Sequence, residues 1–175
     1  GRGFSVNKPD EDLDMRLEPD RTDVTAFDLL NTLPKDKLIF MFSFVLPSNE
    51  ARKVAYLVCR RRDESPFFKV SDLLAILNTN RAEIFLALRM AVNDEIHSIE
   101  MGLRGAVDLL SNGGRLVVIS FHSGEDRLVT HLMKEFEKEG IGESVLKKPL
   151  VPTSEEISLN PKSRSALLRI FEKNE

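Results

Sequence analysis

The sequence contains one cysteine and no long hydrophobic run. Cys59 alone cannot form an internal disulfide, and it offers no cluster of thiolates for a metal. No stretch approaches the ~20 apolar residues of a membrane-spanning helix, and no signal-peptide pattern opens the chain. We therefore expect a protein of a reducing, cytoplasmic compartment that does not use a membrane.

Several common catalytic motifs are also missing. His97, His122 and His131 have no partner at a metal-ligand spacing, so no metal site is predicted. The pair Gly113-Gly114 precedes a predicted strand instead of following one, which excludes a phosphate cradle of the P-loop or dinucleotide type. Ser123 has no glycine-flanked nucleophile elbow around it, so serine hydrolase chemistry is not expected.

The composition describes a globular chain of modest size. Its 175 residues are 42% hydrophobic and 30% charged, with a net charge of −3. Such a chain can bury a core of its own and forms one domain or one domain with a small insert. The net charge does not indicate a nucleic-acid binder, although local basic patches can lie within a neutral average.

The stretch from Leu116 to Phe121 is a nearly unbroken apolar run of strand length. Because it does not alternate with polar residues, it predicts an inner strand of a parallel sheet with both faces buried by helices. Ser123 is a candidate cap for the helix that follows. His122 and Ser123 then lie at the carboxyl end of the strand, where open α/β sheets bind ligands.

Helices are predicted on the N-terminal side of this strand. Thr25 and Asp28 have the spacing of a capping box at the start of a helical block. Asn80 is predicted to cap a longer apolar stripe that runs from Ile84 to Leu110. This stripe exceeds the usual length of a globular helix, so it either links two subdomains or breaks in the middle.

Arginines supply the candidate phosphate contacts. Arg60, Arg61 and Arg62 end a helix predicted at about 49–62, and they form either a solvated helix end or a phosphate-binding patch. Arg16 lies in the polar segment 1–23, where it either holds a ligand or ties the loop down. Both alternatives remain open at each place.

Six short blocks together resemble a known family. In this order they are similar to the small-subunit ribosomal RNA cytosine-N4 methyltransferases, the MraW/RsmH family. The blocks are Arg2–Ser5, Leu13–Arg16, Ala87–Glu95, Gly113–Leu116, Ile119–Arg127 and Asn160–Arg169.

The resemblance implies an S-adenosyl-L-methionine-dependent methyltransferase domain with a class I, Rossmann-like α/β sheet. It also implies an inserted small all-helical domain that helps to hold the RNA. On this mapping, residues 1–23 are a loop of the methyltransferase domain, residues 24–80 are the helical insert, and residues 81–175 are the C-terminal part of the methyltransferase domain. The expected activity is N4-methylation of a cytidine in small-subunit ribosomal RNA, and the expected partner is that RNA or the assembling small subunit.

In the family, the glycine-rich cofactor loop and the acidic residue that holds the ribose precede the block Arg2–Ser5. We therefore expect an N-terminally truncated chain that lacks the main S-adenosylmethionine-binding motifs and is inactive by itself. The alternative is a non-catalytic RNA-binding or ribosome-assembly module derived from the same family.

The resemblance also implies a set of site residues, none of them with an assigned catalytic role. His122 and Ser123 are candidates for the wall of the substrate pocket, together with Arg89 and Asn93 of the long helix. An internal polar network that braces the helix against the sheet is the alternative for Arg89 and Asn93. Candidate RNA or phosphate contacts are Arg16, Arg60, Arg61, Arg62 and Arg127.

Overall fold

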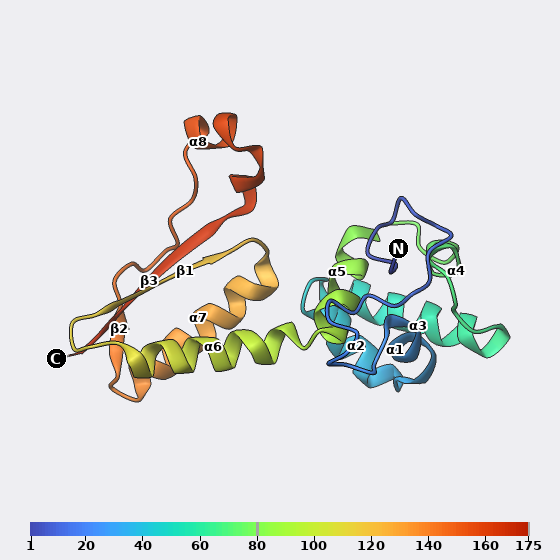
Figure 1. Cartoon of the computed structure of the whole chain (residues 1–175), viewed down its shortest axis with the longest axis horizontal. Coiled ribbons are helices and arrows are strands. Elements are labelled where there is room, and N and C mark those ends of the chain that lie inside the picture. The colour runs from blue at the N-terminus through green and yellow to red at the C-terminus, as the bar shows by residue number, and fades with distance from the viewer. Residues whose placement is uncertain (80, 175) are drawn as a thin grey trace. The chain divides into compact units, whose positions relative to one another are not determined.

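The computed structural model describes residues 1–79 and 81–174, which form a mixed α/β protein of two compact units (Figure 1). The first unit is Gly1–Glu95 and the second is Ile96–Glu175. The helices of the first unit are α1 (Ala26–Thr32), α2 (Lys35–Ser43), α3 (Ser48–Glu64), α4 (Val70–Leu74) and α5 (Arg81–Val92). The second unit contains α6 (Glu95–Leu109) apart from its first residue, followed by β1 (Arg115–Ser120), α7 (Ser123–Lys138), β2 (Gly142–Ser144), α8 (Ser154–Leu159), the 3-10 helix η1 (Pro161–Ser165) and β3 (Leu167–Lys173).

The first helix of the first unit begins where the sequence predicts it, and α3 lies close to the helix predicted at about 49–62. The predicted capping box of α1 is confirmed, because the Thr25 hydroxyl accepts a hydrogen bond from the Asp28 N–H and the Asp28 carboxylate accepts one from the Thr25 N–H. Pro34 and Pro47 directly precede α2 and α3. Proline suits these positions because the first residues of a helix have no intrahelical acceptor for their N–H groups.

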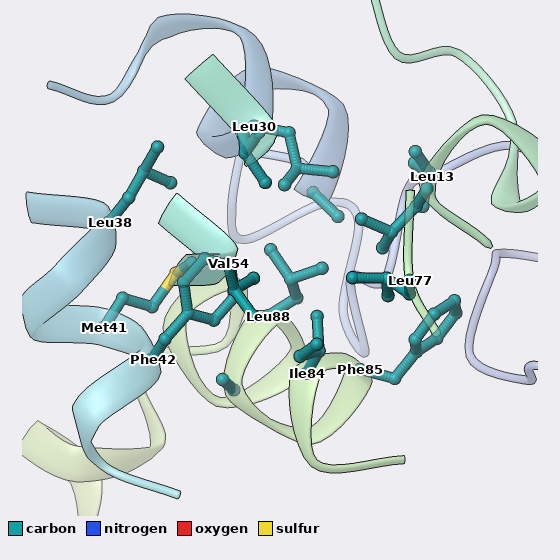
Figure 2. Packing of buried hydrophobic residues seen from close by; sticks show 14 of the residues in the cluster. Leu13, Leu30, Leu38, Met41, Phe42, Val54, Leu77, Ile84, Phe85 and Leu88 are labelled. Atoms are coloured by element: carbon teal, nitrogen blue, oxygen red, sulfur yellow. The ribbon is translucent and has the colours of Figure 1, made fainter. Parts of the chain in front are cut away.

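The core of the first unit combines all five helices with the N-terminal segment. Figure 2 shows part of this core, with labelled residues from α1, α2, α3, α5 and the segment before α1. Phe42 of α2 and Leu88 of α5 are fully buried in it. Leu13 comes from the segment before α1 and is 1% exposed in the same cluster. Residues 1–23 are therefore partly integrated into the core. The domain boundaries that the resemblance implies stay predictions, because compact packing does not define a domain insertion.

The sheet of the second unit has three strands in the order β1-β3-β2. Both pairings among the described residues are antiparallel, so the parallel pairing predicted for this strand is not found there. β1 lies at one edge and has β3 as its partner, so its predicted inner position is not found either. The chain reaches β3 only after the α7 helix and a further excursion through α8 and η1, and it returns in the opposite direction.

The two faces of β1 differ in burial. Leu116 and Val118 face the second core, which also contains Phe171 of β3 and residues of α6 and α7. Val117 and Ile119 point to the other face and are 53% and 54% exposed. The prediction that both faces are buried is therefore wrong for the described chain, because helices α6 and α7 pack into the core on one face only.

The predicted long helix breaks in the middle, which was one of its two predicted outcomes. α5 ends at Val92 and α6 begins at Glu95. Asp94 has a φ of 49°, which a continuous helix does not allow. The predicted cap Asn80 lies outside the described residues. None of the helices described has an apolar stretch long enough to span a membrane.

Candidate functional site

Asn93 joins the end of α5 to the N-terminal segment. Its side-chain amide donates hydrogen bonds to the carbonyl of Met15 at 2.8 Å and to the carbonyl of Arg89 at 2.7 Å. Its side-chain oxygen accepts from the N–H of Leu17 at 2.7 Å. Asn93 therefore holds a loop that lies more than 70 residues away in sequence. This contact explains why asparagine, a weak helix former, follows the last residue of α5.

Met15 adopts an unusual backbone conformation in this loop. Its φ is 58°, and its side chain is fully buried. A non-glycine residue in this region costs about 1–3 kcal/mol, and such strain concentrates at functional sites. The hydrogen bond from the Met15 N–H to the Arg2 carbonyl at 2.7 Å and the bond from Asn93 hold the conformation in place.

Arg16 is tied down inside the same loop. Its guanidinium makes a two-pronged pair with Asp14 at 2.8 and 2.9 Å, and it donates to the Thr22 carbonyl at 3.2 Å. The hydrogen bond from Arg16 is the main cause that lowers the pKa of Asp14. Of the two alternatives for Arg16, the structure shows the structural contact. The prediction that Arg16 also contacts RNA is not tested.

Gly3 connects the first block of the resemblance to this loop. Its φ is 76°, and a Cβ atom there would clash with the Asp12 carbonyl oxygen, so a side chain does not fit. Next to it, the Arg2 guanidinium donates to the carbonyls of Arg16 and Leu17. The blocks Arg2–Ser5, Leu13–Arg16 and Ala87–Glu95 are thus brought together in the first unit.

Arg89 bridges the break between α5 and α6. Its guanidinium pairs with both carboxylate oxygens of Glu95 at 2.8 and 3.0 Å. The Arg89 side chain is 39% exposed, so part of it faces solvent. Arg89 pairs with Glu95 and Asn93 fastens the N-terminal loop, so these hydrogen bonds do not go to the sheet that the structural alternative named. Contact of Arg89 and Asn93 with substrate stays a prediction.

His122 caps α7, a role that the sequence predicted for Ser123. The His122 Nδ1 accepts a hydrogen bond from the Glu125 N–H at 3.3 Å, so the proton of the neutral ring lies on Nε2. This Nε2 is buried, lies 3.3 Å from a Glu125 carboxylate oxygen and makes no aligned hydrogen bond with any described residue. Ser123 is exposed in the first turn of the helix.

Glu125 closes this turn against the end of β1. Its carboxylate accepts from the Phe121 N–H at 2.8 Å. The adjacent His122 side chain is the main cause that lowers the pKa of Glu125, and the Phe121 N–H lowers it further. The strand end, His122 and the first turn of α7 therefore form one rigid corner.

Arg169 fixes this corner to β3, and sequence reasoning missed it. Its guanidinium makes a two-pronged pair with Asp126 at 2.7 and 2.8 Å, and both side chains are 15% exposed. The sequence contains a signal for this pair. Arg169 is a charged residue in the predicted last strand, and Asp126 lies in the acidic first turn of the helix after Phe121. Arg127 is exposed one turn into α7. The blocks Ile119–Arg127 and Asn160–Arg169 thus meet in the second unit.

The predicted arginine cluster at the end of α3 divides into two kinds of side chain. Arg61 stacks on the Phe67 ring and lies 3.6 Å from Asp72, and Arg62 donates to the Leu30 and Leu33 carbonyls at 3.2 and 2.7 Å. Arg60 is exposed and lies 3.9 Å from Glu64. Two of the three arginines therefore brace the fold, and Arg60 faces solvent.

The candidate pocket residues belong to different units. Arg89 and Asn93 are in the first unit, and His122 and Ser123 are in the second. In the first unit hydrogen bonds bring together three of the six blocks, and in the second unit they join the blocks Ile119–Arg127 and Asn160–Arg169. The mixed α/β structure of the chain fits a methyltransferase.

The chain belongs to the MraW methylase family, whose family model matches residues 1–174. Curated relatives similar to the chain carry the name ribosomal RNA small subunit methyltransferase H. One from Methylacidiphilum infernorum is 40% identical over 97% of this chain, and one from Dictyoglomus thermophilum is 38% identical over 100%. One from Coprothermobacter proteolyticus is 40% identical over 98%. The chain spans about 60% of the length of these relatives.

Proposed function

We propose that this chain is the C-terminal part of an S-adenosylmethionine-dependent enzyme that methylates the N4 amine of a cytidine in small-subunit ribosomal RNA. The observation that carries the proposal is the match of nearly the whole chain to relatives named as small-subunit ribosomal RNA methyltransferases. The finer parts of the proposal rest on the resemblance carried by the six blocks. They are methylation at N4, the assembling small subunit as the partner, and the cytoplasm as the compartment.

The free edge of β1 supports a sheet that continues in the longer protein. Among the described residues β1 pairs with β3 alone, and an unpaired edge leaves a row of N–H and C=O groups open to another strand. Val117 and Ile119 leave an apolar face exposed next to it. We infer a larger, Rossmann-like sheet in a methyltransferase domain. Residues 81–175 and the loop 1–23 would belong to that domain, and residues 24–80 would form the helical insert.

The residues around the corner of β1 and α7 do not fit S-adenosylmethionine by themselves. The backbone N–H groups of Phe121 and Glu125, which could face a ligand at this strand end, are occupied by Glu125 and His122 side chains. Gly113 and Gly114 lie before β1, on the wrong side for a cofactor loop. In this proposal the cofactor is therefore held by a part of the protein outside this chain.

This chain would contribute to positioning of the RNA. A cytosine amine is a weak nucleophile because its lone pair is delocalised into the ring. Alignment of the amine with the methyl group can lower the activation barrier by up to about 7–11 kcal/mol. We assign His122 and Ser123 to the wall that receives the flipped base. Arg89, whose side chain is partly exposed, and Asn93 remain candidates for substrate contact within the first unit, and Arg60 and Arg127 would contact phosphates.

Arg16, Arg61 and Arg62 have protein partners that occupy most of their donors. In the proposal they act on RNA by holding neighbouring elements in place, and any direct contact would use the remaining donors.

Two measurements test the proposal. The gene product that contains this chain is incubated with small subunits that lack the modification and with S-adenosylmethionine, and the nucleosides are then separated by mass spectrometry. We expect N4-methylcytidine in the ribosomal RNA. Calorimetric titration of the 175-residue chain alone should show no micromolar binding of S-adenosylmethionine.

Either result can contradict one part of the proposal. Tight cofactor binding by the chain alone would contradict the assignment of the cofactor site to another part of the protein. Absence of N4-methylcytidine, with RNA binding retained, would instead favour the non-catalytic assembly module.

A further inference from the structure

The exposed side of α3 carries an aromatic ring between two arginines. Arg52, Tyr56 and Arg60 follow one another at intervals of four residues, so they lie on one face of the helix. All three are exposed, and Tyr56 is 52% exposed. A large aromatic ring that is left half in solvent among cations is not explained by the core on the opposite side of α3.

Lys35 of the adjacent helix α2 completes this surface, which we call the Tyr56 face (Lys35, Arg52, Tyr56 and Arg60). The Lys35 ammonium lies 5.3 Å from the centroid of the Tyr56 ring, within the range of a cation–π contact. α2 and α3 pack against one another, so the ring is held between two rigid elements. The contact limits the motion of Tyr56 and adds positive charge beside it.

The charges of the Tyr56 face are largely uncompensated. Within residues 1–79 and 81–174, Arg52 has no carboxylate at ion-pair distance, and Arg60 has only the exposed Glu64 at 3.9 Å. Arg61 and Arg62 of the same helix are used inside the protein, with Asp72 and with backbone carbonyls as partners. The helix therefore separates arginines that brace the fold from arginines that face solvent.

We propose that the Tyr56 face binds an unpaired segment of RNA, with a base stacked on Tyr56 and phosphates beside Lys35, Arg52 and Arg60. Unpaired bases stack on aromatic side chains regardless of sequence, and flanking cations follow the backbone. An acidic peptide would use the cations but not the ring. The inference rests on the proposed function, because it assigns part of the ribosomal RNA substrate to this surface of the helical unit.

The test compares two substitutions of Tyr56 in the full chain. Binding of a short fluorescent single-stranded RNA is followed by anisotropy for Tyr56→Ala and Tyr56→Phe. We expect Tyr56→Ala to weaken binding at least about fivefold, since one stacked base contributes that much or more. Tyr56→Phe retains the ring and should bind within about twofold of the unsubstituted chain. Circular dichroism melting curves verify that each variant is folded.

The arginines are tested through the salt dependence. Loss of two phosphate contacts to a single strand should reduce the slope of log K against log salt by about 1.4 for Arg52→Gln combined with Arg60→Gln. The matched control removes two exposed lysines of the second unit, Lys138→Gln combined with Lys162→Gln, and changes the net charge equally. The control should leave the slope nearly unchanged.

Four outcomes would overturn the inference. The first three are equal binding by Tyr56→Ala and the unsubstituted chain, equal slopes for the arginine variant and its control, and displacement of the RNA by polyglutamate at equivalent charge concentration. Absence of RNA binding by the unsubstituted chain would overturn it as well. The N4-methylcytidine measurement uses the protein without substitutions, so it tests the proposed function separately.

Discussion

Asn93 shows how one side chain can define a local structure. Directly after α5, its side chain accepts a hydrogen bond from the Leu17 N–H and donates to the carbonyls of Met15 and Arg89. We expect Asn93→Ala to lower the free energy of unfolding by about 1–3 kcal/mol, because the Leu17 N–H and the Met15 carbonyl lose their partner. Urea unfolding followed by circular dichroism measures this change. The control Asn7→Ala, at an exposed position in the same unit, should change the value by less than about 0.5 kcal/mol.

Glu125 makes stability depend on pH. Its folded-state pKa is lowered, chiefly by His122, so its contribution is fully present above the ordinary glutamate pKa and is lost as the pH falls through the lower, folded-state value. Glu125→Gln keeps the shape and removes the charge. We expect the variant to be less stable near neutral pH, and the difference should shrink at acid pH. A difference that stays constant across this range in unfolding titrations would contradict the assignment.

The pair of Asp126 and Arg169 joins helix to sheet at the scale of elements. It is two-pronged and mostly buried, so we expect a coupling energy of about 1–3 kcal/mol in a double-mutant cycle with Asp126→Asn and Arg169→Gln. The exposed pair of Arg115 and Glu172 is the matched control, and its coupling should be below about 1 kcal/mol. Chemical unfolding of the four variants in each cycle gives both values, and equal couplings would contradict the prediction.

At this scale the sequence predicts individual elements better than their environment. The capping box of Thr25 and Asp28 and the apolar run 116–121 are local signals, and the structure has the capping box at α1 and a strand at 115–120. The neighbours of β1 depend on segments far along the chain. An apolar run does not reveal whether one face is covered within the described chain, so Val117 and Ile119 were wrongly expected to be buried.

The site residues show the same division. Arg89, Asn93 and His122 each make hydrogen bonds to residues near the motifs, and their roles in a site stay predictions. Their partners could not be predicted, since Met15 and Leu17 reach Asn93 across most of the first unit. Arg61 and Arg62 were indistinguishable from Arg60 in sequence. Only the packing of α3 against the segments around Leu33 and Phe67 separates them.

At the scale of the whole molecule, the two units have separate hydrophobic cores with no residue in common. Phe42 is fully buried in the first core and Phe136 is 2% exposed in the second. We expect Phe42→Ala and Phe136→Ala each to destabilise the unit that contains the substitution by about 3–5 kcal/mol. Hydrogen exchange resolved by residue should show the greatest loss of protection in that unit, and the reverse distribution would contradict the prediction.

The hydrogen bonds of Asn93 also set an order of events during synthesis on the ribosome. The carbonyl of Met15 and the N–H of Leu17 leave the ribosome before their partner, which lies 76–78 residues further along the chain. The loop that contains Met15 therefore cannot form its hydrogen bonds with Asn93 until α5 has left the ribosome. Premature termination anywhere before Asn93 would release a helical fragment that cannot close this loop.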